Sequence, residues 1–324
     1  MSNKVLKSKK ASLYQFTQKY SNNIDNCIEF FKSMKWPEGF SCDRCGCHKY
    51  YLVKRVGKTK TSYVLECSSC HKQHSLLSGT IFQSCKLDLY KLLLGIFLFF
   101  NENKGISAVD LCSILDVNYK TALLLENKCR ILMSLSNSDK LLNSPFYEAD
   151  VFNIGAKSKN KAGRASEQQP ILGILSTDKE NNYPRFIKLR VITDYTGLSL
   201  KKNIEKCCVL SHDALLNTDG EKGFNTLNEE IQVKNEKISY EEKDHRLLWL
   251  NIIIGNIKNN ITGIYHGITK REMPLFLNEQ EYRFNHRKMG KTIMDKIKKY
   301  LQRSFPISHR QIVYILNISA PHFS

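Results

Sequence analysis

The chain has 324 residues, enough for a catalytic domain and one or two small modules, and its 49 Lys and Arg against 31 Asp and Glu give a formal net charge of +18. Such an excess favours a polyanionic partner, usually nucleic acid, over the alternative of a merely basic soluble protein. The basic start has no apolar core behind it, and the longest apolar run, Leu92 to Phe100, is too short to cross a bilayer. We therefore expect no signal peptide, no membrane partner, and a cytoplasmic, nucleoid-associated location in which the eleven cysteines stay reduced.

Residues 1–35 open with a lysine-rich arm and continue with an amphipathic helical pattern. From Leu13 to Phe31, apolar side chains recur at steps of three and four residues. This pattern predicts a helix that packs on the next segment. Contact between the arm and DNA is a less specific possibility.

Residues 36–80 contain two CxxC pairs, Cys42 with Cys45 and Cys67 with Cys70. The residues between the pairs, YYLVKRV and TSYVLEC, favour two strands. Two tight turns that each present two thiolates predict a tetrahedral Zn²⁺ site in a zinc ribbon. Four thiolates leave no open position for a substrate, so we expect a structural metal.

Residues 81–140 favour helices throughout. Two of them, AVDLCSIL and YKTALLLENKCRI, are separated by Asp116-Val117-Asn118, with Ser107 and Asn118 as expected N-caps. Helix, short turn and helix predict a helix-turn-helix DNA-binding region, although an ordinary helical hairpin has the same pattern. On the second helix, the side chains that could face DNA are Tyr119, Lys120, Thr121, Lys128 and Arg130.

Residues 141–305 change to the two-residue period of strands. The segments FYEADVFNIG, QPILGILS and PRFIKLRVI predict three strands in hairpin order. A helix (LSLKKNIEKC), a strand near Ala214 to Asn217, a short helix and a longer helix follow. This order predicts a ribonuclease-H-like mixed sheet with flanking helices, so the whole chain is an α/β multidomain protein. Residues 306–324 are expected to form a weak tail.

Two acidic positions in strand-like surroundings, Asp150 and Asp219, precede a predicted helix over Asp244 to Ile268. That helix carries Asn251 and Lys258 on one face, since they are seven residues apart. Two strand-borne carboxylates with a polar ligand and a lysine on a later helix are typical of a divalent-metal phosphoryl-transfer site. Glu148, two residues before Asp150 and on the same strand face, is a rival for the first ligand.

Several ordered motifs together resemble the zinc-ribbon transposases of bacterial insertion sequences (the ISXO-like group of DDE transposases), from about Phe30 to Arg287. These motifs are the CxxC ribbon, SGTIF with its apolar helix, KGISAVDLCSILDVNYKTA, TDGEKGF, GNIKNNITGIYHGIT and EYRFNHR. The resemblance implies a DNA transposase that binds element ends and catalyses metal-dependent strand cleavage and transfer.

The resemblance also implies residue roles. Asp150 and Asp219 match the first two catalytic positions and ligands of Mg²⁺ (or Mn²⁺). Asn251 with Lys258 matches the third position and its lysine, and Asn256 is an alternative third ligand. The matched positions that shape the site or hold DNA are His266 and Arg287.

The chain departs from the family pattern at two places. Val151 stands where an acidic residue usually follows the first aspartate, and Gly155-Ala156 replaces a glycine pair. These departures support an alternative in which a catalytically inactive or domesticated zinc-ribbon and helix-turn-helix protein only binds DNA. A third reading, a zinc-ribbon interaction module like that of RNA polymerase, fits poorly with Asp150 and Asp219. Because two element ends must be joined, we expect a homo-oligomer on double-stranded DNA.

Overall fold

The computed structural model of the protein describes residues 12–57, 61–137, 141–155, 168–178, 183–235, 247–287 and 293–319. The chain forms two compact units. The first, here the amino-terminal unit, comprises Met1–Leu135 and Met289–Ile312, and the second, here the sheet unit, comprises Ser136–Lys288 and Val313–Ser324. Among the helices of these described ranges, none has both the length and the apolar character that a bilayer span requires.

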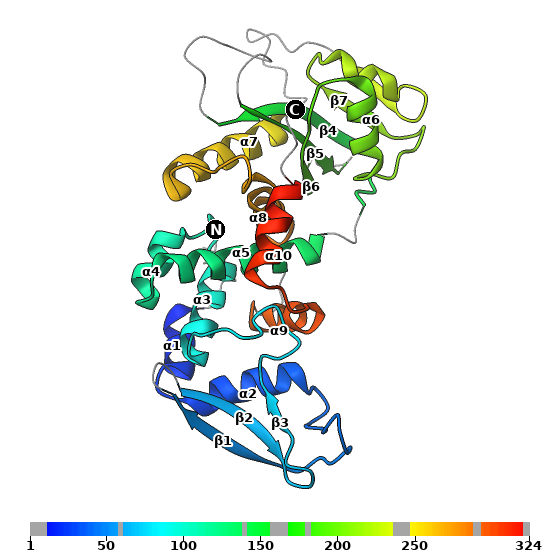
Figure 1. Ribbon diagram of the computed structural model, residues 1–324. Helices are drawn as coiled ribbons and strands as arrows, with labels where there is room; N and C mark the ends of the chain where they lie inside the picture. Colours follow the sequence, from blue (N-terminus) through cyan, green and yellow to red (C-terminus); the bar gives the residue numbers. More distant parts are fainter. Residues whose placement is uncertain are drawn as a thin grey trace, which may run out of the picture. The chain divides into compact units, whose positions relative to one another are not determined.

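A three-stranded antiparallel sheet forms the ribbon of the amino-terminal unit (Figure 1). Its strands are β1 (Tyr50–Val56), β2 (Thr61–Cys67) and β3 (Gln73–Ser75), in the order β1-β2-β3. The first two strands are the two segments predicted from the sequence. Their register sets Tyr50 opposite Cys67, so the ladder ends where the second CxxC pair begins.

The remainder of this unit is helical, and its described helices are α1 (Leu13–Tyr20), α2 (Ile24–Lys35), α3 (Leu89–Asn101), α4 (Ala108–Leu115), α5 (Tyr119–Asn137) and α9 (Ile293–Arg303). The helix expected over Leu13 to Phe31 is divided in two. Asn23 explains the division, because its side chain accepts a hydrogen bond of 3.2 Å from the backbone N–H of Asn26 and so begins a new helix.

Helix α9 belongs to the amino-terminal unit, although it follows the sheet unit in the chain. It packs on α2 and α3, where Lys298 Nζ donates to Ser33 Oγ at 2.9 Å and Gln302 Nε2 donates to the Met34 carbonyl at 2.9 Å. The domain boundaries expected from the sequence differ from this grouping, because they assign residues up to 305 to the catalytic domain. The segment expected to be a weak tail contains a further helix, α10 (His309–Ser319).

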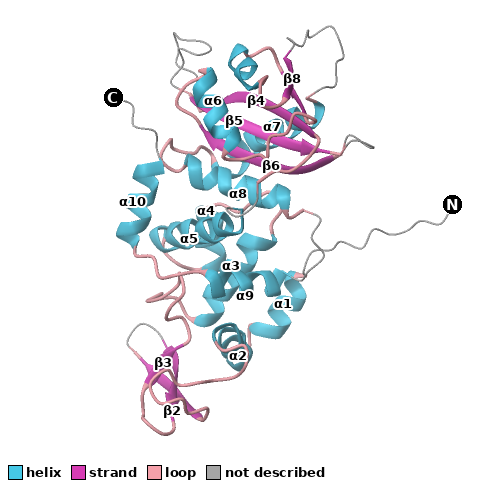
Figure 2. Ribbon diagram, turned by 90° about the vertical axis from the view of Figure 1, so that its right-hand side faces the viewer, coloured by secondary structure: helices cyan, strands magenta, loops and turns pink. Residues whose placement is uncertain are grey.

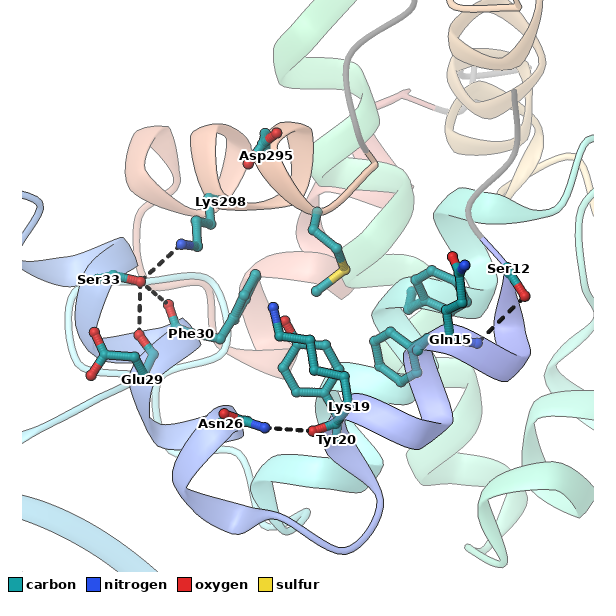
Figure 3. A pocket seen from close by; sticks show the side chains of 13 residues that line it. Ser12, Gln15, Lys19, Tyr20, Asn26, Glu29, Phe30, Ser33, Asp295 and Lys298 are labelled. Atoms are coloured by element: carbon teal, nitrogen blue, oxygen red, sulfur yellow. Dashed lines mark hydrogen bonds between the residues drawn. The ribbon is translucent and has the colours of Figure 1, made fainter. Parts of the chain in front are cut away.

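A cavity of about 440 Å³ lies among α1, α2, α3 and α9 (Figure 3). Phe16 and Phe97 stack at its wall with ring centroids 4.1 Å apart. Lys19 and Lys298 lie beside aromatic rings of the same wall, their ammonium groups 5.3 and 5.4 Å from the ring centroids of Tyr20 and Phe30. None of the side chains predicted to take part in catalysis lines this cavity.

The sheet unit is built on five strands in the order β6-β5-β4-β7-β8 (Figure 2). The strands are β4 (Phe146–Ile154), β5 (Gln169–Thr177), β6 (Pro184–Val191), β7 (Leu215–Thr218) and β8 (Gln232–Asn235). Strands β4, β5 and β6 pair antiparallel, whereas β7 pairs parallel with both β4 and β8. This mixed sheet confirms the predicted ribonuclease-H-like fold, and only the short polar strand β8 was not anticipated.

Helices cover both faces of this sheet. On one face, α6 (Gly197–Glu205) and the 3₁₀ helix η2 (Lys222–Leu227) pack over Tyr147 and Ala149 of β4. On the other face, α7 (Leu248–Asn260) and α8 (Met273–Asn285) pack over Phe152 and Ile154. Because side chains alternate along a strand, Glu148 and Asp150 belong to the α7 face.

Helix α8 also covers the outer edge of β6, which would otherwise present unpaired backbone groups. Asn285 accepts from the Ile187 N–H at 2.8 Å and donates to its carbonyl at 3.0 Å. Glu281 accepts from the Leu189 N–H at 3.2 Å and forms ion pairs with Lys188 and Arg190 at 3.1 and 2.9 Å. The EYRFNHR motif therefore continues the hydrogen bonding of the edge strand.

Candidate functional site

The four cysteines of the two CxxC pairs converge in the ribbon. Their sulfur atoms all lie within 4.8 Å of one another, with 3.6 Å between Cys42 and Cys70 and 3.5 Å between Cys45 and Cys67. Four thiolates bound at about 2.3 Å to one Zn²⁺ would lie about 3.8 Å apart. The arrangement therefore fits one tetrahedral zinc ion, as predicted.

Each cysteine pair lies on a tight turn that ends in left-handed backbone. Gly46 follows the first pair with φ +70°, and its N–H donates to the Cys42 carbonyl at 2.8 Å. His71 follows the second pair with φ +55°, and its N–H donates to the Cys67 carbonyl at 3.1 Å. Burial raises the pKa of Cys42, but hydrogen bonds from the backbone N–H groups of Arg44 and Cys45 outweigh it and lower the pKa to about 6. A low thiol pKa favours the thiolate that a metal requires.

Cys47, His48 and His71 are close to this cluster in the sequence but are not part of it. The Cys47 sulfur contacts Ser68 Oγ at 3.6 Å, and His48 Nδ1 lies 3.0 Å from the Phe40 carbonyl. His71 instead faces Glu66 at 3.4 Å. The four-cysteine set predicted from spacing is thus the set that the ribbon brings together.

Strand register brings the two predicted catalytic aspartates together in the sheet unit. Strands β4 and β7 run parallel, and their last paired residues are Ala149 and Thr218. Asp150 is the next residue of β4, and Asp219 directly follows the end of β7, so extending the register sets them side by side on the same face of the sheet. The Asp219 charge accordingly acts on Asp150. Gly220, with φ +67°, then turns the chain away from this edge.

The charges around Asp150 show that several ionisable groups meet here. Burial raises the pKa of Asp150 above its ordinary value, and the carboxylates of Asp219 and Glu221 raise it further. The Val151 N–H, which donates to Asp150 Oδ1 at 2.7 Å, and the Lys258 ammonium act in the opposite direction. Lys258 Nζ also lies 5.7 Å from the ring centroid of Phe152, next along the same strand face.

Glu148, the rival first ligand, has a different partner. It is 2% exposed, and its Oε2 accepts a hydrogen bond of 2.9 Å from the Leu250 N–H in the first turn of α7. That helix has no side-chain cap of its own, so the Glu148 carboxylate takes this role and interacts with the helix dipole. Burial raises the pKa of Glu148 to about 7.

Asn251 is exposed on α7, directly after the residue that bonds to Glu148. Both Asn251 and Lys258 are exposed, and their seven-residue spacing keeps them on one side of the helix. Asn256 is exposed as well, but about 100° per residue turns it well away from that side. Helix α7 approaches the sheet closely because Gly173, opposite Asp150, has no side chain, and a Cβ there would lie 3.3 Å from Leu250.

The departure at Val151 lies on the other face of the sheet. Val151 is half-buried against the core beneath α6, so an acidic residue there would point away from Asp150. Of the Gly155-Ala156 pair, Gly155 has φ +120° and Ala156 lies outside the described residues, as does the basic loop from Lys157 to Arg164. The altered position therefore removes no group from the carboxylate site.

The two positions that the resemblance associated with DNA or with site shape differ in their surroundings. His266 is exposed and has left-handed backbone, with φ +52°, directly after a π-helical turn, Ile261–Tyr265. Arg287 donates to the carbonyls of Arg185 and Phe284 at 3.1 and 2.7 Å and also to the carbonyl of Pro184. These bonds hold the end of α8 against β6, so Arg287 has a structural role, while a contact of Arg287 with DNA remains a prediction.

The helix-turn-helix pattern forms as expected. Ser107 Oγ accepts from the Asp110 N–H at 3.1 Å, and Asn118 Oδ1 accepts from the Thr121 N–H at 2.9 Å, which confirms both predicted caps. Tyr119 and Lys120 are exposed in the first turn of α5, and Thr121 is half-buried. DNA contact by Tyr119, Lys120 and Thr121 remains a prediction.

The expectation that Lys128 and Arg130 could face DNA is wrong. Lys128 is 7% exposed, and its Nζ donates to the Ile81 carbonyl at 2.5 Å. Arg130 is 1% exposed and forms an ion pair with Glu126 at 2.6 Å. Helix α5 is covered by its own unit beyond its first turns, so these cations have protein partners.

Sequence reasoning missed the proximity of Glu221 to Asp150. Thr218 Oγ1 donates to Asn235 Oδ1 at 2.7 Å, and Asn235 Nδ2 donates to the Glu221 carbonyl at 2.9 Å. Asn235 therefore holds both ends of the turn that follows β7. The motif TDGE carried the signal, since two acidic residues flank one turn glycine.

A zinc ribbon followed by a ribonuclease-H-like sheet unit is the domain organisation of a DDE-type transposase. Comparison with protein families finds both parts in that order: residues 23–73 match the transposase zinc-ribbon domain, and residues 144–285 match the ISXO2-like transposase domain. The chain thus belongs to the zinc-ribbon transposases of the ISXO2-like group, which implies that it binds DNA. A comparison with curated proteins gave no match.

Proposed function

We propose that this protein is the active DNA transposase of an insertion sequence, which binds the ends of its element and catalyses metal-dependent strand cleavage and strand transfer. The observation that carries the proposal is the register of β4 and β7, which sets Asp150 beside Asp219 on the face covered by α7. Lys258, whose charge acts on Asp150, comes from that helix.

The donor atoms fit Mg²⁺ or Mn²⁺. Carboxylate oxygens are the hard ligands that these cations prefer. The pKa of Asp150 is raised by burial and by two neighbouring carboxylates, so a cation bound there would relieve an unfavourable concentration of negative charge. Asp150 and Asp219 would hold the metal, and the amide oxygen of Asn251 would complete the set with less negative charge than a third carboxylate.

Bound Mg²⁺ supplies Lewis-acid stabilisation of the phosphoryl group and lowers the pKa of an attacking water or 3′-hydroxyl. The side chains of this chain supply position and charge. Glu148 fixes the start of α7 against β4, which would hold Asn251 and Lys258 in position for the metal site. The Lys258 ammonium would neutralise a phosphate of the bound strand.

DNA recognition is proposed for the amino-terminal unit. The exposed first turn of α5, with Tyr119, Lys120 and the adjoining Thr121, would enter a groove of the duplex, and the ribbon would contact the backbone. Two element ends must be held together for transfer, so the active form is a homo-oligomer on DNA. A protein that stays monomeric when saturated with end DNA would contradict this oligomer.

A second candidate is a catalytically inactive or domesticated DNA-binding protein. The neutral Asn251 favours it, because an amide binds a divalent cation more weakly than a carboxylate does. Val151 does not favour it, since that side chain packs beneath α6 on the opposite face of the sheet.

Cleavage of labelled duplexes tests the proposal. The duplexes cover the DNA on either side of the gene and are incubated with Mg²⁺ or Mn²⁺ and with wild type, Asp150→Asn or Asp219→Asn. Wild type is expected to cut, while both variants bind the duplex but cut about 10³-fold more slowly, as the loss of several kcal/mol of metal stabilisation predicts. Specific binding by wild type without cutting under either metal would favour the second candidate.

A further inference from the structure

The segment Lys258–Arg271, from the last turn of α7 onward, carries exposed basic side chains. Its first residue lies near the carboxylate site, because Lys258 Nζ is 5.7 Å from the ring centroid of Phe152, two residues after Asp150 on the same strand face. From His245 to Arg271 the sequence contains no acidic residue, and Lys258, Lys270 and Arg271 are all exposed. The segment begins at Lys258, whose charge acts on Asp150. A strand of nucleic acid at the carboxylate site could thus continue along a surface of complementary charge.

The backbone of this segment is unusual. Helix α7 ends in a single π-helical turn, Ile261–Tyr265, followed by His266 and Gly267 with φ +52° and +123°. π-Helical turns are rare and often found at functional sites, and left-handed backbone is uncommon at residues other than glycine. A left-handed residue beside a glycine is a common helix ending, so the π-helical turn is the unusual feature of this segment.

Contacts within the segment and with α8 nevertheless hold it firmly. Asn260 Nδ2 donates to Gln280 Oε1 at 2.9 Å, and the Gly267 N–H donates to the Ile261 carbonyl at 3.1 Å. The Tyr265 ring meets Phe276 with centroids 5.4 Å apart, and its hydroxyl donates to Glu279 of α8. These contacts fix the backbone of the segment, which lowers the entropic cost of binding.

Two of the cations stand where a helix does not favour them. Lys270 and Arg271 directly precede Glu272, the N-cap residue of α8, whose carboxylate accepts a hydrogen bond of 2.8 Å from the Thr269 hydroxyl. The positive end of a helix dipole destabilises nearby cations by a few tenths of a kcal/mol to about 1 kcal/mol. A phosphate bound at this position would reverse that effect, because both the cations and the helix end attract an anion.

We propose that Lys258–Arg271 is a phosphate-binding track for the DNA strand that enters the carboxylate site. Lys258 and Thr262, one helical turn or about 6 Å apart on one face, contact the phosphates nearest the scissile bond. His266, Lys270 and Arg271 contact the phosphates beyond them. The role assigned to the track rests on the proposed function, but phosphate binding by these residues can be measured without cleavage.

The test is the salt dependence of binding to a 30-base-pair duplex (about three helical turns of DNA) by the full-length protein, without divalent metal. The variant is Lys270→Ala/Arg271→Ala. Its matched control is Lys202→Ala/Lys206→Ala, which removes two exposed lysines on or next to α6, across the sheet. Loss of two phosphate contacts lowers the slope of log K against log salt by about 1.8 in magnitude. We expect that reduction in the first variant and wild-type behaviour in the control.

Cleavage with Mn²⁺ separates failure of the track from failure of the proposed function. If wild type cuts DNA and Lys270→Ala/Arg271→Ala keeps the wild-type salt slope, the track is wrong and the catalytic function stands. If wild type binds DNA without cutting it and the variant has a smaller slope of log K against log salt, the track stands and the catalytic function falls. Equal loss of slope in the variant and the control would also overturn the track, because it would show only a general effect of charge.

Discussion

The ribbon and the sheet unit each gather a set of candidate metal ligands, but they do so in different ways. In the ribbon, two turns of the same small sheet bring four cysteine sulfurs within 4.8 Å. In the sheet unit, Asp150 and Asp219 come from strands that are neighbours only through the parallel pairing of β4 with β7. The ribbon set is closed by its own residues, whereas the carboxylate pair has Lys258 of α7 near it and no third carboxylate from that helix.

This difference matches the two expected roles, a structural metal site in the ribbon and a substrate-binding metal site in the sheet unit. A closed set of thiolates can bind an ion tightly and stabilise a small sheet that buries little core. An open set of hard ligands leaves positions for water and substrate oxygens. The pKa of Asp150 is raised, first by burial and then by the neighbouring carboxylates of Asp219 and Glu221.

The largest effect is expected in the ribbon. Cys67→Ser removes one of four thiolates, and structural Zn²⁺ contributes about 10–16 kcal/mol in small zinc domains. We expect loss of the bound zinc and unfolding of the ribbon, measured by zinc stoichiometry and circular dichroism. Cys47→Ser is the matched control, because its sulfur contacts Ser68 and Cys67 from outside the group of four clustered sulfurs. Zinc retained in Cys67→Ser, or lost in both variants, would contradict the assignment.

A smaller effect is expected at the cap of α7. The pKa of Glu148 is raised to about 7 in the folded chain, so between pH 4.5 and 7 the folded state binds more protons than the unfolded state. Stability from this group is therefore present below pH 4.5 and is lost as the pH rises through 7. Glu148→Gln has no such dependence, so relative to wild type its free energy of unfolding should rise by about 3 kcal/mol between pH 4.5 and 8.

The measurement is urea unfolding at both pH values in magnesium-free buffer, followed by the fluorescence of Trp249 in a Trp36→Phe background. Trp249 lies on α7, next to the residue that bonds to Glu148. Trp36→Phe alone is the control for the background. A difference between variant and wild type that stays constant with pH would show that Glu148 is not buried as described.

The smallest effect separates Asn251 from Asn256. Asn251→Asp adds a carboxylate on the side of α7 that carries Lys258, so it should lower the Mn²⁺ concentration for half-maximal cleavage about tenfold, equivalent to 1.4 kcal/mol. Asn256→Asp adds the same charge on another side of the helix and should leave the Mn²⁺ requirement unchanged. The opposite result would make Asn256 the third ligand and would move the site around α7.

Sequence reasoning succeeded where signals are local. The cysteine spacing, the caps at Ser107 and Asn118, and the alternating strands around Asp150 all depend on neighbours within a few residues. The pairing of β4 with β7 was accessible only through the order of elements and the family resemblance. Strand β8 was missed because Gln232–Asn235 is short and polar, without the β-branched alternation that marks a strand.

Other features depend on long-range packing and could not be predicted. Nothing in the sequence of α9 indicates that it packs on α2 and α3 rather than on the sheet unit that precedes it in the chain. Lys128 and Arg130 carry the positive charge expected of a DNA-facing surface, yet their partners are the Ile81 carbonyl and Glu126. Glu148 looked like a metal ligand by strand alternation, and only the position of α7 shows it to be a helix cap.

The central claim is that Asp150 and Asp219 form one metal site, and localised oxidation tests it most directly. Fe²⁺ replaces Mg²⁺ in the zinc-loaded protein, ascorbate and peroxide generate hydroxyl radicals at the bound ion, and mass spectrometry locates the cuts in the chain. We expect cuts near residues 150 and 219 together, and the loss of both in Asp150→Asn. Cuts at one aspartate only, or cuts that persist unchanged in Asp150→Asn, would contradict it.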